Sequence, residues 1–264
     1  MDIALRVLGI GAWSPVFNDW PALRAILRGE AAPAEAGVGK PAPAVLPAAE
    51  RRRAPETVLL AAQAAAEACA MAQCEAANLP CVFASSQGDI AITDTMCATI
   101  AAAPLELSPT KFHNSVHNAP VGYWTIATQC RCASTALSAR HYSVGAGLLE
   151  AAVQAVDQDG PVLLVCYDSA AGSTALQQMA PHACGFAAAF VLAPARGDAG
   201  RALRLRRAPA GTPASAWPTP VLAGLASNPS AAALILLDAL AKAPVGGVHL
   251  PASPGMMLTV DLLE

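Results

Sequence analysis

A strand–helix–strand pattern in the middle of the chain constrains the fold more than any other stretch. Ser134–Ala139 alternates in polarity and predicts a buried strand. Ser143 opens a helix, Val144–Val156, whose apolar residues recur at helical spacing, and a polar turn leads on to a second apolar strand, Pro161–Cys166. Because backbone N–H groups and the helix dipole favour negative charge at a helix N-terminus, a strand that leads directly into one is a good position for a nucleophile.

The same alternation of strands and Ala-rich helices runs through the rest of the sequence. The other predicted strands are Ile3–Trp13, Cys81–Ser85, Gly185–Pro194, Arg201–Arg207, Val248–Pro251 and Met256–Leu263. The other predicted helices are Trp20–Leu27, Pro55–Ala76, Ile90–Ala102, Asn114–Thr128 and Ala231–Ala243, and residues 31–49 and Ser169–Pro181 are predicted loops. The basic outward positions of Arg201–Arg207 predict an edge strand. This order predicts an α/β fold with Ala-rich helices layered on a mixed sheet.

Composition and charge exclude several function classes. The 264 residues are 55% hydrophobic but only 5% aromatic, which favours close packing of backbones around small side chains in one large or two small domains. The net charge is −3 and no basic stripe alternates with aromatic residues, so nucleic-acid binding is not expected. We read no signal peptide and no apolar run long enough to span a membrane, and therefore expect a reduced, soluble, cytoplasmic protein.

Three possible sites were weighed against simpler structural roles. His113 and His117 have the spacing of a metal pair on one helical face, but no third ligand follows, so packing or interface roles are preferred. Gly9-x-Gly11 lacks a complete phosphate-binding motif, and close backbone packing explains it better. Cys130-x-Cys132 is a poor ligand spacing and a poor nucleophile pair, since only Arg131 is nearby to stabilise a thiolate. No metal and no cofactor are expected.

Several segments resemble the β-ketoacyl synthases of the thiolase fold. Asn118 and Gly122 match the helix before the nucleophile, Asp159–Leu164 matches a later turn and strand, and Leu8–Pro15 (LGIGAWSP) resembles the opening of these enzymes. The resemblance implies a truncated thiolase-like fold. Residues 1–195 would form the N-terminal half, and residues 196–264 a shortened, degenerate C-terminal half packed on it in a single compact domain.

The resemblance also implies that the nucleophile position is degenerate. In the synthases a cysteine occupies the start of the helix after the strand. Alignment by counting places this position at His141, and alignment by the small-residue pattern places it at Ser143; neither is cysteine. The synthases also carry two catalytic histidines in their C-terminal half, and His182 and His249 lack the sequence contexts of both.

The sequence most resembles the truncated, N-terminal-type β-ketoacyl synthase-like proteins of aryl-polyene and xanthomonadin-type pigment clusters. The shared segments are Ser115–Ala119, Gly122–Trp124, Gly147–Ala151 and Ala49–Ala54. This resemblance implies a catalytically inactive chain length factor that forms a heterodimer with an active β-ketoacyl synthase, shapes its acyl pocket and meets the chain bound to acyl carrier protein indirectly. The residues expected at the interface or pocket are His113, Ser115, His117, Asn118, Tyr123 and Trp124.

Two alternatives remain open from the sequence. The protein could be an independent acyltransferase or thioesterase that uses Ser143 with His141, or a cysteine, against acyl thioesters. It could also be a homodimeric scaffold without an enzyme partner. Activity of the isolated chain would favour the first alternative, and its oligomeric mass with and without a synthase would test the second.

Overall fold

The chain builds one mixed sheet. The computed structural model describes residues 1–35, 37–171, 184–242 and 246–263. Within these residues the strands are β1 (Asp2–Trp13), β2 (Cys81–Ala84), β3 (Ser134–Leu137), β4 (Val162–Asp168), β5 (Phe186–Pro194), β6 (Arg201–Arg207), β7 (Gly246–Ser253) and β8 (Met256–Leu262). Their order in the sheet is β3-β2-β4-β5-β1-β6-β8-β7. Strands β3, β2 and β4 are parallel, and every other neighbouring pair is antiparallel. The predicted α/β fold with a mixed sheet is confirmed.

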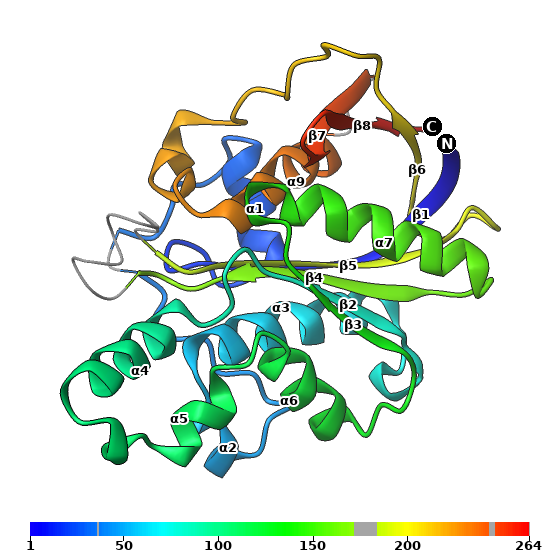
Figure 1. Ribbon diagram of the computed structural model, residues 1–264. Helices are drawn as coiled ribbons and strands as arrows, with labels where there is room; N and C mark the ends of the chain where they lie inside the picture. Colours follow the sequence, from blue (N-terminus) through cyan, green and yellow to red (C-terminus); the bar gives the residue numbers. More distant parts are fainter. Residues whose placement is uncertain (36, 172–183, 243–245, 264) are drawn as a thin grey trace.

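Helices cover both faces of this sheet (Figure 1). The helices are α1 (Trp20–Leu27), α2 (Ala48–Arg53), α3 (Glu56–Ala72), α4 (Ile90–Ala102), α5 (Pro109–Asn114), α6 (Ala119–Thr128), α7 (Ser143–Asp157) and α9 (Ala233–Lys242). Helices α3 and α6 lie on one face, with α2, α4 and α5 beyond them, and α1, α7 and α9 lie on the other. Short 3-10 segments lie between these helices and the strands: η1 (Ala76–Asn78), η2 (Pro104–Glu106), η3 (Arg140–Tyr142), η4 (Pro220–Leu225) and η5 (Pro229–Ala232).

The central strands divide their side chains between two hydrophobic cores. Along β4, Leu164 and Cys166 belong to the core under α7, whereas Val165 and Tyr167 belong to the core under α3. All seven residues of β4 are buried. This follows from the twofold periodicity of a strand, because a strand covered on both faces must be apolar throughout.

Glycines in β1 let α3 approach the sheet closely. A side chain at Gly11 would collide with the backbone carbonyl of Ala64 in α3, and one at Gly9 with that of Ala68. Only hydrogen fits at these two positions. The predicted close backbone packing of Gly9-x-Gly11 is therefore confirmed, and the glycines face a helix backbone instead of a ligand.

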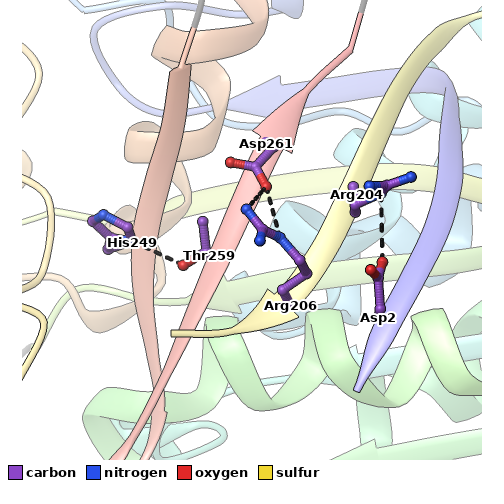
Figure 2. Close-up of polar contacts among 6 residues, drawn as sticks. All are labelled: Asp2, Arg204, Arg206, His249, Thr259 and Asp261. Carbon is purple, nitrogen blue, oxygen red and sulfur yellow. Dashed lines mark hydrogen bonds and ion pairs between the residues drawn. The ribbon is translucent and has the colours of Figure 1, made fainter. Parts of the chain in front are cut away.

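Two predictions about the sheet edges are wrong. Strand β6 is not an edge strand, because it pairs with β1 on one side and β8 on the other. Its exposed arginines lie on an open sheet face, where Figure 2 shows Arg204 paired with Asp2 at 3.4 Å and Arg206 with Asp261 at 2.6 Å. Conversely, β3 is not buried: among the described strands only β2 pairs with it, and its residues are half-buried or exposed.

Most predicted element bounds agree with the structure to within a few residues. The largest difference is the helix predicted at Asn114–Thr128: the helix found there, α6, begins only at Ala119, and Asn114 is the last residue of the separate helix α5. Pro120 lies in the first turn of α6 as expected. The predicted strand Arg201–Arg207 and the two closing strands are present, and they extend the sheet from β1. Most of the predicted loop Ser169–Pro181 and all of His182 lie outside the described residues. Among the described helices, none is both long and apolar enough to cross a membrane.

Candidate functional site

A buried polar cluster lies where the parallel strands end. Asp168, at the end of β4, is 1% exposed and accepts hydrogen bonds from Ser85 Oγ at 2.8 Å, Ser230 Oγ at 2.7 Å and the Ser86 N–H at 2.9 Å. Asn228 donates to the Asp168 carbonyl at 2.9 Å. Carboxyl ends of parallel strands are the usual place for a site in α/β proteins. Here the polar groups hold β2, β4 and η5 together.

The elbow between β3 and α7 lies beside this cluster. Arg140 has a φ of +54°, which is uncommon for a residue with a side chain. The Ser143 hydroxyl stabilises the turn: it donates to the Arg140 carbonyl at 2.7 Å and accepts from the Ala139 N–H at 3.0 Å. Ser138 Oγ donates to the Ser86 carbonyl at 2.7 Å, which ties the elbow to the end of β2.

Neither residue of the expected nucleophile position has the surroundings of a nucleophile. Ser143 is 2% exposed, and backbone groups already use its hydroxyl. His141 is exposed and, within the described part of the chain, makes no side-chain hydrogen bond that could activate Ser143. A serine nucleophile needs a base within hydrogen-bonding distance. The geometry therefore offers no support for acyl transfer through Ser143 and His141.

Cys69, Cys81 and Cys132 are also unfavourable nucleophiles. Cys130 and Cys132 precede β3, at the strand end opposite to the elbow. Burial raises the pKa of Cys69 and Cys81 to about 12, and burial together with Cys130 raises the pKa of Cys132. Because the thiolate is the reactive form, these surroundings suppress nucleophilic attack at neutral pH.

The six residues expected at an interface or pocket separate into two groups. His113, Asn118 and Tyr123 line an open cavity of about 550 Å³, whose other lining residues are Leu46, Pro47, Glu50, Val116, Ala119, Gly122, Ile126 and Ala127. The other three residues lie elsewhere. Trp124 is 1% exposed and packs in the core under α3, and Ser115 donates to the Phe112 carbonyl at 2.8 Å.

His117 points toward the end of β2, away from the cavity. Its Nε2 lies 3.2 Å from the Ser85 carbonyl oxygen, and its ring packs against Gly88. The structure thus does not bring His113 and His117 together as a metal pair. Across the described residues, no group of three or more His, Cys, Asp and Glu side chains could hold a metal ion. His249 lies 3.2 Å from Thr259 Oγ in the β7–β8 hairpin (Figure 2).

Exposed apolar side chains occur along the segment from α4 to α6, which also supplies most of the cavity lining, and the sequence analysis did not identify them. Five large apolar residues are exposed there: Ile100 at 52%, Leu105 at 100%, Phe112 at 62%, Val116 at 46% and Ile126 at 81%. They come from α4, η2, the α5 region and α6, and two of them line the cavity. We call these five residues the apolar surface. Exposed apolar patches are typical of protein interfaces, and Val116 and Ile126 contribute to one at the cavity. The sequence did contain a signal for this exposure, because α4 and α6 show only weak amphipathic periodicity. A helix without a clear polar face needs a second layer to cover its apolar residues.

Comparisons with known proteins agree with this fold. A family model described as "Beta-ketoacyl synthase, N-terminal domain" matches residues 24–235. No curated protein matches the chain. The chain is similar to one in the complex of a ketosynthase (ApeO) with its chain length factor (ApeC) from Xenorhabdus doucetiae, with 18% identity and a TM-score of 0.75, covering 98% of this chain and 99% of that one.

Two further structures show how the length compares. The ishigamide ketosynthase/chain length factor matches with 14% identity and a TM-score of 0.67, covering 98% of this chain and 99% of that chain. A type II PKS acyl-carrier protein in complex with its ketosynthase (AntDE:AntF) matches with 15% identity and a TM-score of 0.58, but there this chain covers only 64% of the matched chain. At these identities the likeness concerns the fold, and it confirms the predicted truncated thiolase-like, ketosynthase-type fold. Because the family match spans well over half of the 264 residues, the chain belongs to the β-ketoacyl synthase, N-terminal domain family.

Proposed function

We propose that this protein is a non-catalytic chain length factor that forms a heterodimer with an active β-ketoacyl synthase and shapes its acyl pocket in polyene-type fatty acid or polyketide biosynthesis. The observation that carries the proposal is the elbow itself. The ketosynthase-type fold of this chain holds no thiol at the elbow, and Ser143 is buried and hydrogen-bonded to the turn. An elbow without a nucleophile cannot accept an acyl group from a thioester, so the condensation must take place on another chain.

The surface of the molecule supports a partner. Strand β3 is a sheet edge, and an edge strand carries unpaired backbone N–H and C=O groups that can pair with another chain. The apolar surface supplies the side chains that an interface core requires. Two structures that this chain matches over nearly its whole length are described as ketosynthase/chain length factor assemblies, which is consistent with such a partner. The acyl carrier protein would then meet this chain only through the synthase, in the cytoplasm.

The first experiment measures assembly and acylation together. This chain and a β-ketoacyl synthase are purified alone and after co-expression, and each sample is incubated with an acyl thioester. We expect a stable one-to-one complex, an acyl adduct on the synthase and no change in the intact mass of this chain. Acylation of the isolated chain at Ser143 or at a cysteine would favour the independent acyltransferase or thioesterase. A homodimer that does not bind the synthase would favour the homodimeric scaffold without an enzyme partner.

The second experiment tests whether the cavity sets product length. A Cβ atom built at Gly122 meets no atom within 4 Å, and Gly122 lines the cavity, so we expect Gly122→Leu to fill part of the cavity without disturbing the fold. We expect the variant complex to release shorter products at an unchanged rate of initiation. Gly224→Leu in η4 is the matched control, because Gly224 is equally uncrowded and lies outside the cavity. An unchanged product length in the Gly122 variant would contradict a role for this cavity.

A further inference from the structure

Five of the eight free cysteines gather at one corner of the molecule. Cys69 and Cys74 come from the end of α3, Cys81 begins β2, and Cys130 and Cys132 lie between α6 and β3. These thiols are close enough to affect each other electrostatically: Cys74 and Cys130 raise the pKa of Cys69, and Cys130, Cys132 and Cys69 raise that of Cys81, in both cases after the larger effect of burial. The corner is separate from the elbow, which lies at the other end of β3.

Within this corner, Cys130 and Cys132 form a distinct pair. Only Arg131 separates them in the sequence, and both sulfur atoms face the same segment of the chain. Each thiol also contacts the segment around η1: Cys130 Sγ lies 3.3 Å from the Leu79 carbonyl oxygen, and Cys132 Sγ lies 3.8 Å from that of Ala77. Cys132 is half-buried and within reach of small reagents, whereas Cys130 is 8% exposed. An accessible thiol can form a mixed disulfide, and a second thiol nearby can then displace the small thiol from it.

We propose that Cys130 and Cys132 are a reversible modification site that closes into a disulfide, and that closure releases the loop between α6 and β3 from η1. The oxidant is a small-molecule disulfide. The Cys132 thiolate attacks it, forming a mixed disulfide and expelling one small thiolate. The Cys130 thiolate then attacks the Cys132 sulfur and expels the second. In total the two protein thiols lose two protons and two electrons, and the small disulfide is reduced to two thiols.

The structural consequence follows from the loss of two donors. A disulfide has no S–H group, so the carbonyls of Ala77 and Leu79 lose the thiols that now contact them. The loop is short, since α6 ends at Thr128 and β3 begins at Ser134. Closure should therefore loosen the start of β3. The inference does not depend on the proposed partner, because it is tested on the isolated chain.

The sequence provides a direct assay, because Arg131 lies between the two cysteines. The native protein is incubated with oxidised glutathione at mildly alkaline pH, since the raised pKa of Cys132 slows attack at neutral pH. Free thiols are then blocked with iodoacetamide and the protein is digested with trypsin. Cleavage after Arg131 places Cys130 in peptide 112–131 and Cys132 in peptide 132–140, while Cys69, Cys74, Cys81 and Cys97 share peptide 54–111.

We expect a species in which peptides 112–131 and 132–140 are covalently linked, two hydrogen atoms lighter than their sum and separated by a reductant. Cys130→Ser and Cys132→Ser should each abolish it, and Cys97→Ser, which removes an exposed thiol on α4, should not. Amide exchange in Ser134–Leu137 should become faster in the linked form. The proposal is overturned if both peptides are recovered alkylated while peptide 54–111 carries glutathione, if either is linked to peptide 54–111, or if glutathione remains on Cys132. Unchanged exchange would overturn the release of the loop.

Discussion

The elbow and the apolar surface differ in which side chains are free to contact another molecule. At the elbow, Ser143, Ser138 and Asp168 all bond to other parts of the protein. On the apolar surface, Ile126 and Phe112 are largely exposed and have nothing covering them within the described chain. Catalysis requires polar groups that are free to meet a substrate, and association requires apolar groups that are free to meet a partner. The contrast is the one that the proposed non-catalytic partner requires, because its polar groups at the elbow are bonded internally and its apolar groups are exposed.

The largest effect is expected where the polar cluster is broken. Asp168→Ala leaves two buried hydroxyls and one backbone N–H without their acceptor. Because each unpaired buried donor costs about 1–3 kcal/mol, we expect the free energy of unfolding to fall by about 3 kcal/mol or more, measured by urea denaturation. Asp94→Ala in α4 is the control, since Asp94 is half-buried and makes no side-chain hydrogen bond or ion pair with any residue that the structure describes. A loss below about 1 kcal/mol would mean that the cluster is not structural.

A smaller effect, on binding alone, is expected at the apolar surface. Ile126→Asp places a charge on a side chain that is 81% exposed, so the free energy of unfolding should change by no more than about 0.5 kcal/mol. Burying that charge at an interface should weaken synthase binding by at least about tenfold, measured by titration calorimetry or by loss of co-elution.

The control for this variant carries the same change elsewhere. Val221→Asp modifies an apolar side chain that is 59% exposed on η4, away from α5 and α6. It should leave synthase binding unchanged. Equal weakening in both variants would show that added negative charge, and not the position of Ile126, disturbs the complex.

The fold was largely predictable because its signals are local. The apolar run of β4, the alternation of strands with Ala-rich helices and Pro120 at the start of α6 each determine a nearby element. The sheet order was not predictable in the same way. The position of β6 depends on β8, which is more than 50 residues later and returns to pair with it, so a strand with arginines on one face was assigned to an edge. The residue pattern of a strand does not show which distant strand it pairs with.

The sequence predicts which residue types occupy the candidate site, but only part of how their side chains are arranged. The missing cysteine at the elbow can be read from the residues themselves, whereas the buried hydrogen bonds of Ser143 require coordinates. Trp124 illustrates the limit. It follows Tyr123 directly, yet helical geometry turns it into the core while Tyr123 lines the cavity. The sequence analysis also missed Ile126, which is three residues beyond Tyr123 and exposed on the same helix.

The last prediction concerns the buried carboxyl of Glu67, and it tests whether the hydrogen bonds of this group offset the cost of burying it. Glu67 in α3 accepts hydrogen bonds from the Ala12 N–H at 2.9 Å and the Trp20 N–H at 2.7 Å, so it links β1 to the start of α1. Burial raises the pKa of Glu67 to about 7, and the two backbone donors offset only part of that rise. The folded state therefore holds a proton that the unfolded chain releases near pH 4.5.

The sign of the pH dependence follows from this raised pKa. The stabilising contribution of protonated Glu67 is complete below the unfolded pKa and is lost as the pH rises through about 7. The free energy of unfolding of the wild-type protein should thus decrease from pH 5 to pH 8 relative to Glu67→Gln, whose amide does not titrate. Urea denaturation of both proteins at each pH measures the difference, in which the shared titration of other groups cancels. Parallel curves would show that Glu67 stays ionised in the fold, and that its two backbone donors compensate fully for its burial.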